Sequence, residues 1–272
     1  MPPPHRFVRH ARSVTNQTGC VPTDLAEDPG ALLDGLVAPG ATGPAGTGGR
    51  AGAADRADAG ASDTWSLDRL RLAEVAFVPE VRLHLAEDAI VLWARLEAAA
   101  GGPLEPPFWA SAWAGGQAVA RYVLDHPDVV AGRRVLDLAA GSGLVAIAAA
   151  LAGAAAVTAN DIDPYALAAV AWNARANGVT VTGSHGDLLD GDGADAEVVL
   201  AGDVFYSRAM AARVLPFLER AMARGARVLV GDPGRAFLPH DRLETVASYP
   251  VQSPGALEDA QLDQTSVLQP RS

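Results

Sequence analysis

The feature that most constrains the fold is an alternation, between residues 134 and 231, of short β-branched runs with longer runs of helical spacing. Strands that alternate with helices in this way predict βαβ units, in which right-handed crossovers leave the strands parallel. We therefore expect an α/β fold with a seven-stranded, mostly parallel, doubly wound sheet. Its strands are expected at Arg134–Leu138, Ala156–Asp161, Thr180–Ser184, Glu197–Asp203, Arg227–Gly231, Thr245–Val251 and Thr265–Gln269.

Helical runs fit between these strands, and others come before the sheet begins. In the sheet region they are expected at Leu144–Leu151, Tyr165–Asn177 and Ala209–Arg224. The Gly- and Asp-rich connection after the third strand is either a short helix near Leu188 or mostly loop. Before the first strand we expect an N-terminal helical cap, and we interpret the apolar spacing of its opening segment as helical. That segment contains Leu67, Leu70, Leu72, Val78, Val81, Leu83 and Leu85, and helices over Ile90–Ala100 and from about Gly116 to Leu124 follow it.

The chain divides by composition into a tail and a folded unit. Ala and Gly dominate residues 30–61, and no Leu, Ile, Val or aromatic residue occurs from Pro39 to Ala61. A segment of this composition cannot bury enough apolar surface to offset the entropy lost on ordering. We therefore predict a disordered Ala/Gly-rich tail over residues 1–62 and one folded domain over residues 63–272, with the cap at 63–130 and the core at 131–272.

Charge and cysteine content argue against several classes of function. The net charge is −11, and all 21 basic residues are arginine, so the chain contains no lysine. This acidic balance argues against a nucleic-acid partner, because phosphate contacts need clustered Lys or Arg. The single Cys20 rules out an internal disulfide and a multi-Cys zinc site, and the scattered histidines do not indicate a metal.

No segment is expected to span a membrane. The most apolar stretch, Val135–Val157, is interrupted by Asp137 and by glycines, whereas a span needs about 20 predominantly apolar residues. The N-terminal residues include arginines but lack the apolar run that is typical of a secretory signal. We therefore expect a cytoplasmic protein.

The sharpest local signal is the segment Val135–Gly143, which predicts a strand, a tight turn of small residues and the start of a helix. Gly141 and Gly143 allow the backbone to turn sharply and leave room for a ligand against it. The carboxyl end of such a strand is where open α/β sheets bind ligands. A nucleotide-like cofactor is therefore the default hypothesis.

Two cofactors fit this turn. Gly141, Gly143 and Ala146 match the dinucleotide pattern G-x-G-x-x-G/A, and Asp161 lies 20 residues beyond Gly141, as an NAD site requires. Asp137, however, is a carboxylate at the end of the strand, which repels a pyrophosphate and suits a cationic ligand. S-adenosylmethionine (SAM) carries an amino group and a sulfonium and has no phosphate. We favour SAM, with Asp161 as the partner of its ribose diol.

Each carboxylate also has a structural interpretation. An Asp at the end of a strand is often the N-cap of the following helix. Asp187, after the third strand, is placed to take the adenine amino group, but Asp190 and neighbouring loop acids compete for that assignment.

Beyond the glycine turn, four more specific motifs follow one another along the chain. They are Trp113-Ala114-Gly115-Gly116, Asn160-Asp161-Ile162-Asp163-Pro164, Asp203-Val204-Phe205-Tyr206 and Gly231-Asp232-Pro233-Gly234-Arg235. In this order they resemble class I SAM-dependent methyltransferases. More narrowly, the chain is similar to the electron transfer flavoprotein β-subunit lysine N-methyltransferases and their bacterial relatives. The resemblance covers about Val78 to Val267 and implies a Rossmann-like core.

The resemblance also implies roles for individual residues. Asp203, Phe205 and Tyr206 stand in the family's D/E-x-x-Y/F motif, which faces the methyl group, and they are the catalytic candidates. Trp113 is expected to border the cofactor. It joins the other candidate cofactor-binding residues, which are Asp137, Gly141, Gly143, Asp161 and Asp187.

The acceptor side of the site follows from the chemistry of an amine. A lysine ammonium, with a reference pKa of about 10.4, has to lose a proton before it can attack. We expect Asp203 to draw in and orient this cation rather than act as a strong base. Phe205 or Tyr206, together with Trp109, would wall its methylene stem. Alternatively, Phe205 is a core residue, and Trp109 and Trp113, four apart, form a packing pair on one helix face.

We expect SAM-dependent methyl transfer to a lysine side chain of a protein substrate, of the electron transfer flavoprotein β-subunit type. The alternatives within the class are a ribosomal protein, or a small-molecule amine or pyridine nitrogen, as acceptor. From other classes, an NAD-dependent oxidoreductase or a non-catalytic nucleotide-binding module stays open. No metal, nucleic acid or membrane is expected as a partner, and the protein is expected to act as a monomer. Gly231–Gly234 is expected to be a structural turn, with Arg235 shaping the substrate entrance.

Overall fold

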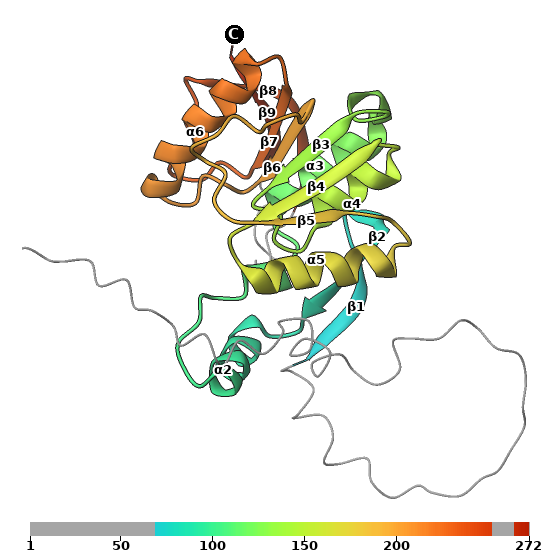
Figure 1. Cartoon of the computed structure of the whole chain (residues 1–272), viewed down its shortest axis with the longest axis vertical. Helices are drawn as coiled ribbons and strands as arrows, with labels where there is room; N and C mark the ends of the chain where they lie inside the picture. Colours follow the sequence, from blue (N-terminus) through green and yellow to red (C-terminus); the bar gives the residue numbers. More distant parts are fainter. Residues whose placement is uncertain (1–68, 252–263, 272) are drawn as a thin grey trace, which may run out of the picture.

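The computed structural model describes residues 69–251 and 264–271, which form a hairpin, a seven-stranded sheet and the helices around them (Figure 1). The order in the sheet is β5-β4-β3-β6-β7-β9-β8. The first five of these strands are parallel, and β9 pairs antiparallel with both β7 and β8. This confirms the expected mostly parallel sheet. The strands are β3 (Arg134–Leu138), β4 (Ala156–Asp161), β5 (Thr182–His185), β6 (Val198–Gly202), β7 (Arg227–Asp232), β8 (Leu243–Pro250) and β9 (Gln264–Pro270).

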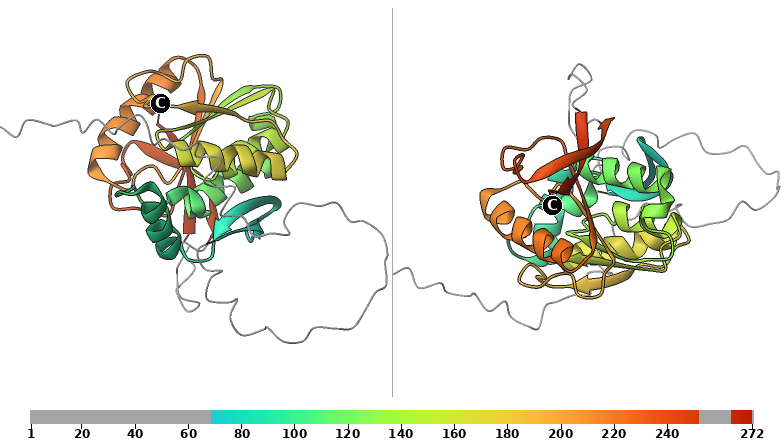
Figure 2. Two further views of the ribbon diagram at one scale, coloured as in Figure 1. Left: turned by 60° about the horizontal axis from the view of Figure 1, so that its bottom comes forward. Right: turned by 90° about the horizontal axis from the view of Figure 1, so that it is seen from above.

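Helices lie on both sides of the sheet, as Figure 2 shows. They are α3 (Ala114–Asp125), α4 (Leu144–Leu151), α5 (Pro164–Ala176) and α6 (Arg208–Ala223). Successive side chains of a strand point to opposite faces of a sheet. Accordingly, Val135 and Leu200 pack in one core cluster with α3, α4 and α5, whereas Leu136 and Val199 pack in a second cluster with α6. The sheet is therefore doubly wound, as predicted.

The helices begin where local chemistry satisfies their first backbone N–H groups. Asp163 caps α5, because its side chain accepts the N–H of Tyr165, and Pro164 occupies the first helical position. Ser207 caps α6 by accepting the N–H of Met210. These starts agree to within one residue with the helices expected from the sequence.

The segment expected to open a helical cap is instead a hairpin of β1 (Leu70–Val75) and β2 (Val78–Ala86). In β2, Val81 and Leu83 are fully buried, and their two-residue spacing puts them on one face of a strand rather than of a helix. They share a core cluster with Leu144 of α4. The helical interpretation of residues 70–85 was therefore wrong. The helices expected after it are present as α2 (Ala89–Ala100) and α3, with single turns η1 (Phe108–Ala110) and η2 (Pro127–Val129) around α3.

Two further expectations concern connections and boundaries. The segment between β5 and β6 contains turns and no helix, so the loop alternative near Leu188 is confirmed, and Leu189 packs in the α6 cluster. Helix α3 belongs to the sheet core, because Ala118 and Val119 are fully buried with the strands. The tail predicted over residues 1–62 lies outside the described residues.

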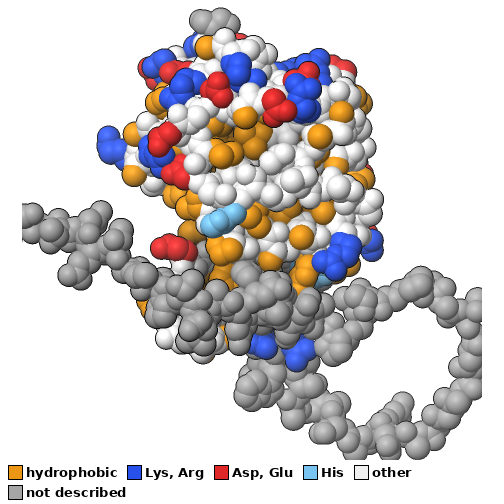
Figure 3. Space-filling view, in the orientation of Figure 1, with side chains coloured by type: hydrophobic (Ala, Val, Ile, Leu, Met, Phe, Trp, Pro, Cys, Tyr) orange, Lys and Arg blue, Asp and Glu red, His pale blue; other side chains and the backbone are white. Residues whose placement is uncertain are grey.

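The described surface carries charges of both signs. Figure 3 shows basic and acidic side chains interspersed on one face, over the upper part of the molecule. Among the described residues, no helix is long and apolar enough to cross a membrane. Within the same part of the chain, no group of His, Cys, Asp and Glu side chains is arranged to hold a metal ion.

Candidate active site

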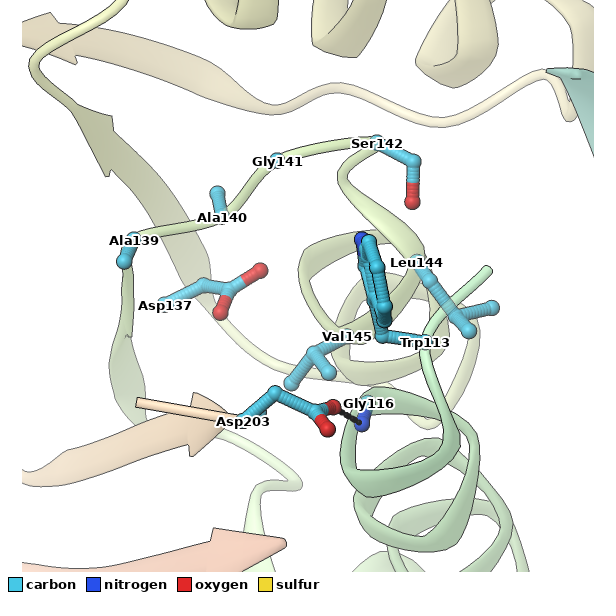
Figure 4. Close-up of a pocket in the computed structure, with 11 residues that line it drawn as sticks. Trp113, Gly116, Asp137, Ala139, Ala140, Gly141, Ser142, Leu144, Val145 and Asp203 are labelled. Atoms are coloured by element: carbon cyan, nitrogen blue, oxygen red, sulfur yellow. Dashed lines mark hydrogen bonds between the residues drawn. The ribbon is translucent and has the colours of Figure 1, made fainter. Parts of the chain in front are cut away.

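A pocket opens at the carboxyl ends of β3 and β6, where α3 and α4 begin (Figure 4). Its volume is about 50 Å³, which is far below the ~300 Å³ of sites that enclose a drug-sized ligand. A nucleoside-sized ligand is therefore expected to extend beyond it. The lining residues are Trp113, Gly116, Asp137, Ala139, Ala140, Gly141, Ser142, Leu144, Val145, Gly202 and Asp203.

The turn after β3 forms one wall of this pocket. Ala139 and Gly141 have left-handed φ angles of 55° and 52°, so the chain reverses sharply before α4. Asp161, at the end of β4, ties the turn down. Its Oδ2 accepts the N–H of Gly141 at 2.9 Å, and its Oδ1 accepts the N–H of Asp163 at 3.0 Å. Each carboxylate oxygen can accept a further hydrogen bond, so Asp161 can also hold a ribose diol.

Asp137 lies beneath the turn and is almost completely buried. Its exposed fraction is 1%, and its Oδ2 accepts the N–H of Ala146 in the first turn of α4 at 2.9 Å. Burial, with a smaller contribution from the negative charge of Asp161, raises the pKa of Asp137 to about 8. A cation placed beside this carboxyl group would favour its ionised form, whereas a pyrophosphate would oppose it. The residues present therefore fit the amino group and sulfonium of SAM.

The two glycines of the turn have different roles. Gly141 lines the pocket, and a Cβ there would meet nothing closer than 3.9 Å, the Cα of Trp109. Gly143 has a φ of 78°, and a Cβ there would lie 3.1 Å from Cγ2 of Val170 in α5. Gly143 is absent from the pocket lining, so the expectation that it leaves room for the ligand is corrected. It is needed for the turn and for the packing of α5.

The start of α3 lies directly against the ends of β6 and β7 because glycines remove the side chains between them. A Cβ on Gly115 would lie 2.2 Å from the carbonyl oxygen of Gly231, and a Cβ on Gly202 would lie 2.6 Å from the Cα of Gly116. Both distances are under 3.0 Å, which Cβ atoms essentially never show. This backbone contact explains the paired glycines after Trp113, and it brings the N-terminus of a helix to the pocket.

Asp203 follows β6 and meets that helix. Its φ is 73°, which a residue other than glycine adopts only where its surroundings impose it. Its N–H donates to the carbonyl oxygen of Gly231 at 2.9 Å. Its Oδ2 accepts the N–H of Gly116 at 2.9 Å, and its Oδ1 accepts a hydrogen bond from Nη2 of Arg235 at 2.7 Å. Asp203 therefore caps the start of α3, and the cap of α6 is Ser207 instead.

The electrostatics of Asp203 follow from these contacts. Burial raises the pKa of its carboxyl group, while the Arg235 guanidinium and the Gly116 N–H act in the opposite direction. Figure 4 shows the carboxylate beside the start of α3, with Trp113 and Asp137 around the same space. A buried, strained carboxylate in a pocket is a strong candidate for a functional group.

Trp113 borders the pocket from the N-cap position of α3. Its indole N–H donates to the carbonyl oxygen of Phe108 at 2.8 Å, which fixes the ring plane. The guanidinium carbon of Arg235 lies 5.7 Å from the ring centroid, within the range of a cation–π contact. Trp109 lies in η1 and packs in a buried cluster with Leu92, whereas Trp113 is the N-cap of α3, so the two tryptophans do not form a packing pair on one helix face.

Five of the predicted side chains do not line the pocket, and one of them, Asp161, contacts it only through the turn that it holds. Phe205 is fully buried in the α6 cluster, and Trp109 is 2% exposed in a cluster with Leu92 of α2. Both rings are used in core packing, so neither walls the acceptor, and the alternative interpretation of Phe205 as a core residue is confirmed. Tyr206 is 58% exposed beside the site and stays a prediction. The Asp187 carboxylate pairs with Arg213 and accepts a backbone N–H, which favours its structural interpretation over a contact with adenine.

Several lining residues were not predicted, because they contribute backbone atoms and small side chains rather than charged or reactive groups. They are Ala139, Ala140, Ser142, Val145 and Gly202. Their only signal in the sequence was that they adjoin the glycine turn or Asp203.

Comparisons with known proteins place the chain among methyltransferases. The family model described as ribosomal protein L11 methyltransferase (PrmA) matches residues 121–204. The electron transfer flavoprotein beta subunit lysine methyltransferase of Danio rerio is 42% identical over 163 residues, 59% of this chain and 62% of that protein. The protein of the same name from Rattus norvegicus is 38% identical over 188 residues, 66% of this chain and 72% of that protein. The chain belongs to this family.

Membership in the electron transfer flavoprotein beta subunit lysine methyltransferase family confirms the expected enzyme class, with SAM as the methyl donor. It also removes the NAD-dependent oxidoreductase and the non-catalytic nucleotide-binding module, in agreement with the buried Asp137. A ribosomal protein L11 methyltransferase from Methylococcus capsulatus (strain ATCC 33009 / NCIMB 11132 / Bath) matches a shorter segment, 45% identical over 111 residues, 40% of this chain and 33% of that protein. The chain spans somewhat less than two thirds of the Danio rerio protein.

Proposed function

We propose that this protein methylates the side-chain amine of a lysine in a protein acceptor, and that this acceptor is the β subunit of an electron transfer flavoprotein. The observation that carries the proposal is the position of Asp203, a buried carboxylate at the pocket edge, in a chain of this methyltransferase family. The names of the most similar relatives support the acceptor.

The residues of the turn and of α3 would hold the methyl donor. SAM, when bound, supplies a methyl group on a positively charged sulfur. Asp137 would neutralise its cationic end, and Asp161 would take its ribose hydroxyls while continuing to hold the turn. The Trp113 ring, fixed by its bond to Phe108, would form the wall between donor and acceptor.

Asp203 would hold the acceptor by charge. Burial raises the pKa of its carboxyl group, while the guanidinium of Arg235 and the N–H of Gly116 act in the opposite direction. The ion pair with Arg235 shows that this carboxylate can hold an organic cation, as an incoming ammonium would require. The ammonium then gives its proton to water, and the neutral amine stays oriented within ~3–3.5 Å of the reacting carbon. Asp203 thus acts by binding and orienting the amine, since the proton leaves to water.

The direct test is methyl transfer to a purified acceptor. The protein would be incubated with radiolabelled SAM and the recombinant electron transfer flavoprotein β subunit of its own organism, followed by mass spectrometry of the labelled peptide. We expect methyl groups on a lysine of that subunit. If other proteins in a lysate are labelled but the β subunit is not, the methyl-transfer reaction is supported and the β subunit is refuted as its acceptor.

A second acceptor is ribosomal protein L11, because the family model named for its methyltransferase matches residues 121–204, which include the glycine turn and Asp203. The same assay with purified ribosomal protein L11 distinguishes between the two acceptors. No observation favours a small amine or a pyridine nitrogen.

We also propose that the protein works as a monomer in the cytoplasm. Size-exclusion chromatography with light scattering, and fractionation of cells that express the native protein, test these two points.

A further inference from the structure

The acceptor side of the pocket holds a cation of the protein's own. Arg235 donates from Nη2 to Oδ1 of Asp203 at 2.7 Å, and its guanidinium carbon lies 5.7 Å from the centroid of the Trp113 ring. A carboxylate and an aromatic face together form a binding site for any organic cation, including the ammonium of a lysine. Arg235 therefore uses the two groups that an acceptor lysine would need.

The backbone of Arg235 is held independently of its guanidinium. Oδ1 of Asp232 accepts the backbone N–H groups of Gly234 and Arg235 at 2.8 and 2.7 Å, which holds the base of the side chain. Nε of Arg235 is buried without a hydrogen-bond partner, and so is Oδ2 of Asp232. A buried, unpaired N–H group costs free energy. The guanidinium can therefore leave Asp203 without disturbing the turn that carries it.

Two cations are not expected to share this buried carboxylate, because each would repel the other at low dielectric. Exchange of one cation for another conserves the charge of the site, whereas a neutral side chain in place of the guanidinium would leave the buried carboxylate of Asp203 without an opposite charge. The site therefore favours a positively charged acceptor over an uncharged one such as glutamine.

We propose that Arg235 occupies the acceptor subsite of the free protein, as an internal stand-in for the substrate lysine, and that an acceptor lysine binds by taking over Asp203 and Trp113 from it. This inference rests on the proposed function. It adds that the subsite is specific for a cation on a flexible side chain. It also adds that an acceptor lysine binds only when it displaces Arg235.

The absence of lysine from the chain makes a sharp test available. In an Arg235→Lys variant, the new ammonium would replace the guanidinium at Asp203 and become an acceptor itself. The S–CH₃ bond of SAM would break, an N–CH₃ bond would form, S-adenosylhomocysteine would leave as a neutral thioether, and the displaced proton would pass to water. Wild-type protein offers no lysine to label, so the background is confined to its N-terminal amine.

The experiment uses full-length protein with a lysine-free tag, labelled SAM and no acceptor. The matched control is Arg121→Lys, an arginine of α3 that is held by Glu80 and Asp125 and lies outside the pocket lining. We expect label in Arg235→Lys at least about tenfold above both wild type and Arg121→Lys, because a positioned intramolecular acceptor has a high effective concentration. The rate per molecule should not change on dilution, and adding Asp203→Asn to Arg235→Lys should remove the label.

The outcomes separate this inference from the proposed function. If Arg235→Lys still methylates the electron transfer flavoprotein β subunit but does not label itself, Arg235 does not occupy the acceptor subsite. If wild type methylates neither that subunit nor any other protein, the proposed function fails first. Should Arg235→Lys lose its fold, Arg235→Gln decides through the acceptor kinetics. Removal of the competing cation is expected to lower KM for the acceptor several-fold, and an unchanged or higher KM overturns the inference.

Discussion

Replacement of Gly115 by Ala tests whether the contact of α3 with β6 and β7 builds the site. The added Cβ would lie 2.2 Å from the carbonyl oxygen of Gly231 and 2.6 Å from Oδ2 of Asp203. The first of these atoms belongs to the backbone of a central strand and cannot rotate away. Helix α3 would have to move outward by roughly 1 Å, in a core packed closely enough that such shifts are felt. That movement would stretch the hydrogen bond from Gly116 to Asp203.

The size of the effect can be worked from these contacts. Overpacking a close-fitting interior costs about 1–3 kcal/mol. Weakening a hydrogen bond to a charged group adds up to about 1.5–3 kcal/mol. Replacing Gly by Ala inside a helix stabilises the helix by about 1 kcal/mol, which offsets part of this loss. We expect Gly115→Ala to lower the free energy of unfolding by roughly 2–4 kcal/mol, which corresponds to a Tm lower by roughly 5–15 °C for a domain of this size.

The adjacent glycine provides the control. A Cβ on Gly116 would meet only Cγ2 of Val145, at an ordinary 3.9 Å, so Gly116→Ala should change stability by no more than about 1 kcal/mol. Both variants would be compared with wild type by urea denaturation and calorimetry, without ligand because Gly116 lines the pocket. If Gly115→Ala has the same Tm as Gly116→Ala, the reasoning is refuted, because the backbone of α3 would then not lie close to β7.

Three further predictions follow from individual residues. Asp203→Asn should leave SAM affinity within a few-fold of wild type, because Asp137 and Asp161 are expected to contact SAM. It should lower turnover by roughly 10²-fold, because the acceptor would be misplaced. Near-normal turnover would remove Asp203 from the catalytic residues. The raised pKa of Asp137, about 8, means that the folded protein retains a proton that the unfolded chain loses above about pH 4. Stability without ligand should therefore fall as pH rises from about 4 to about 8, by up to ~1.4 kcal/mol per pH unit relative to Asp137→Asn. Equal slopes in urea titrations of the two proteins would contradict this. Deletion of residues 1–62 should leave Tm and SAM affinity nearly unchanged, because the segment has too few apolar residues to join a core, and a large fall in Tm would show that it packs on the domain.

Local patterns in the sequence were enough to locate most of the sheet and the turn that carries the pocket. Strands β3 and β4 and helix α4 have the predicted bounds, because buried parallel strands are short apolar runs and helices between them are longer. The turn at Gly141 could be predicted because its left-handed φ needs a residue without a side chain. The hairpin at residues 70–86 could not, since leucines and valines spaced two and three apart fit either period until their burial is known.

What the sequence determined by itself is therefore the alternation of elements, the small-residue turn and the presence of carboxylates at the strand ends, because these depend on neighbours a few positions away. Only the tertiary structure decided which of those groups share a site. Phe205 stands two residues from Asp203, yet it packs into the core, because side chains after a strand leave in different directions. Arg235 stands 32 positions from Asp203 and binds it directly. Such a contact depends on the close approach of α3, β6 and β7, which no local pattern records, because distant glycines make it possible only once the chain has folded.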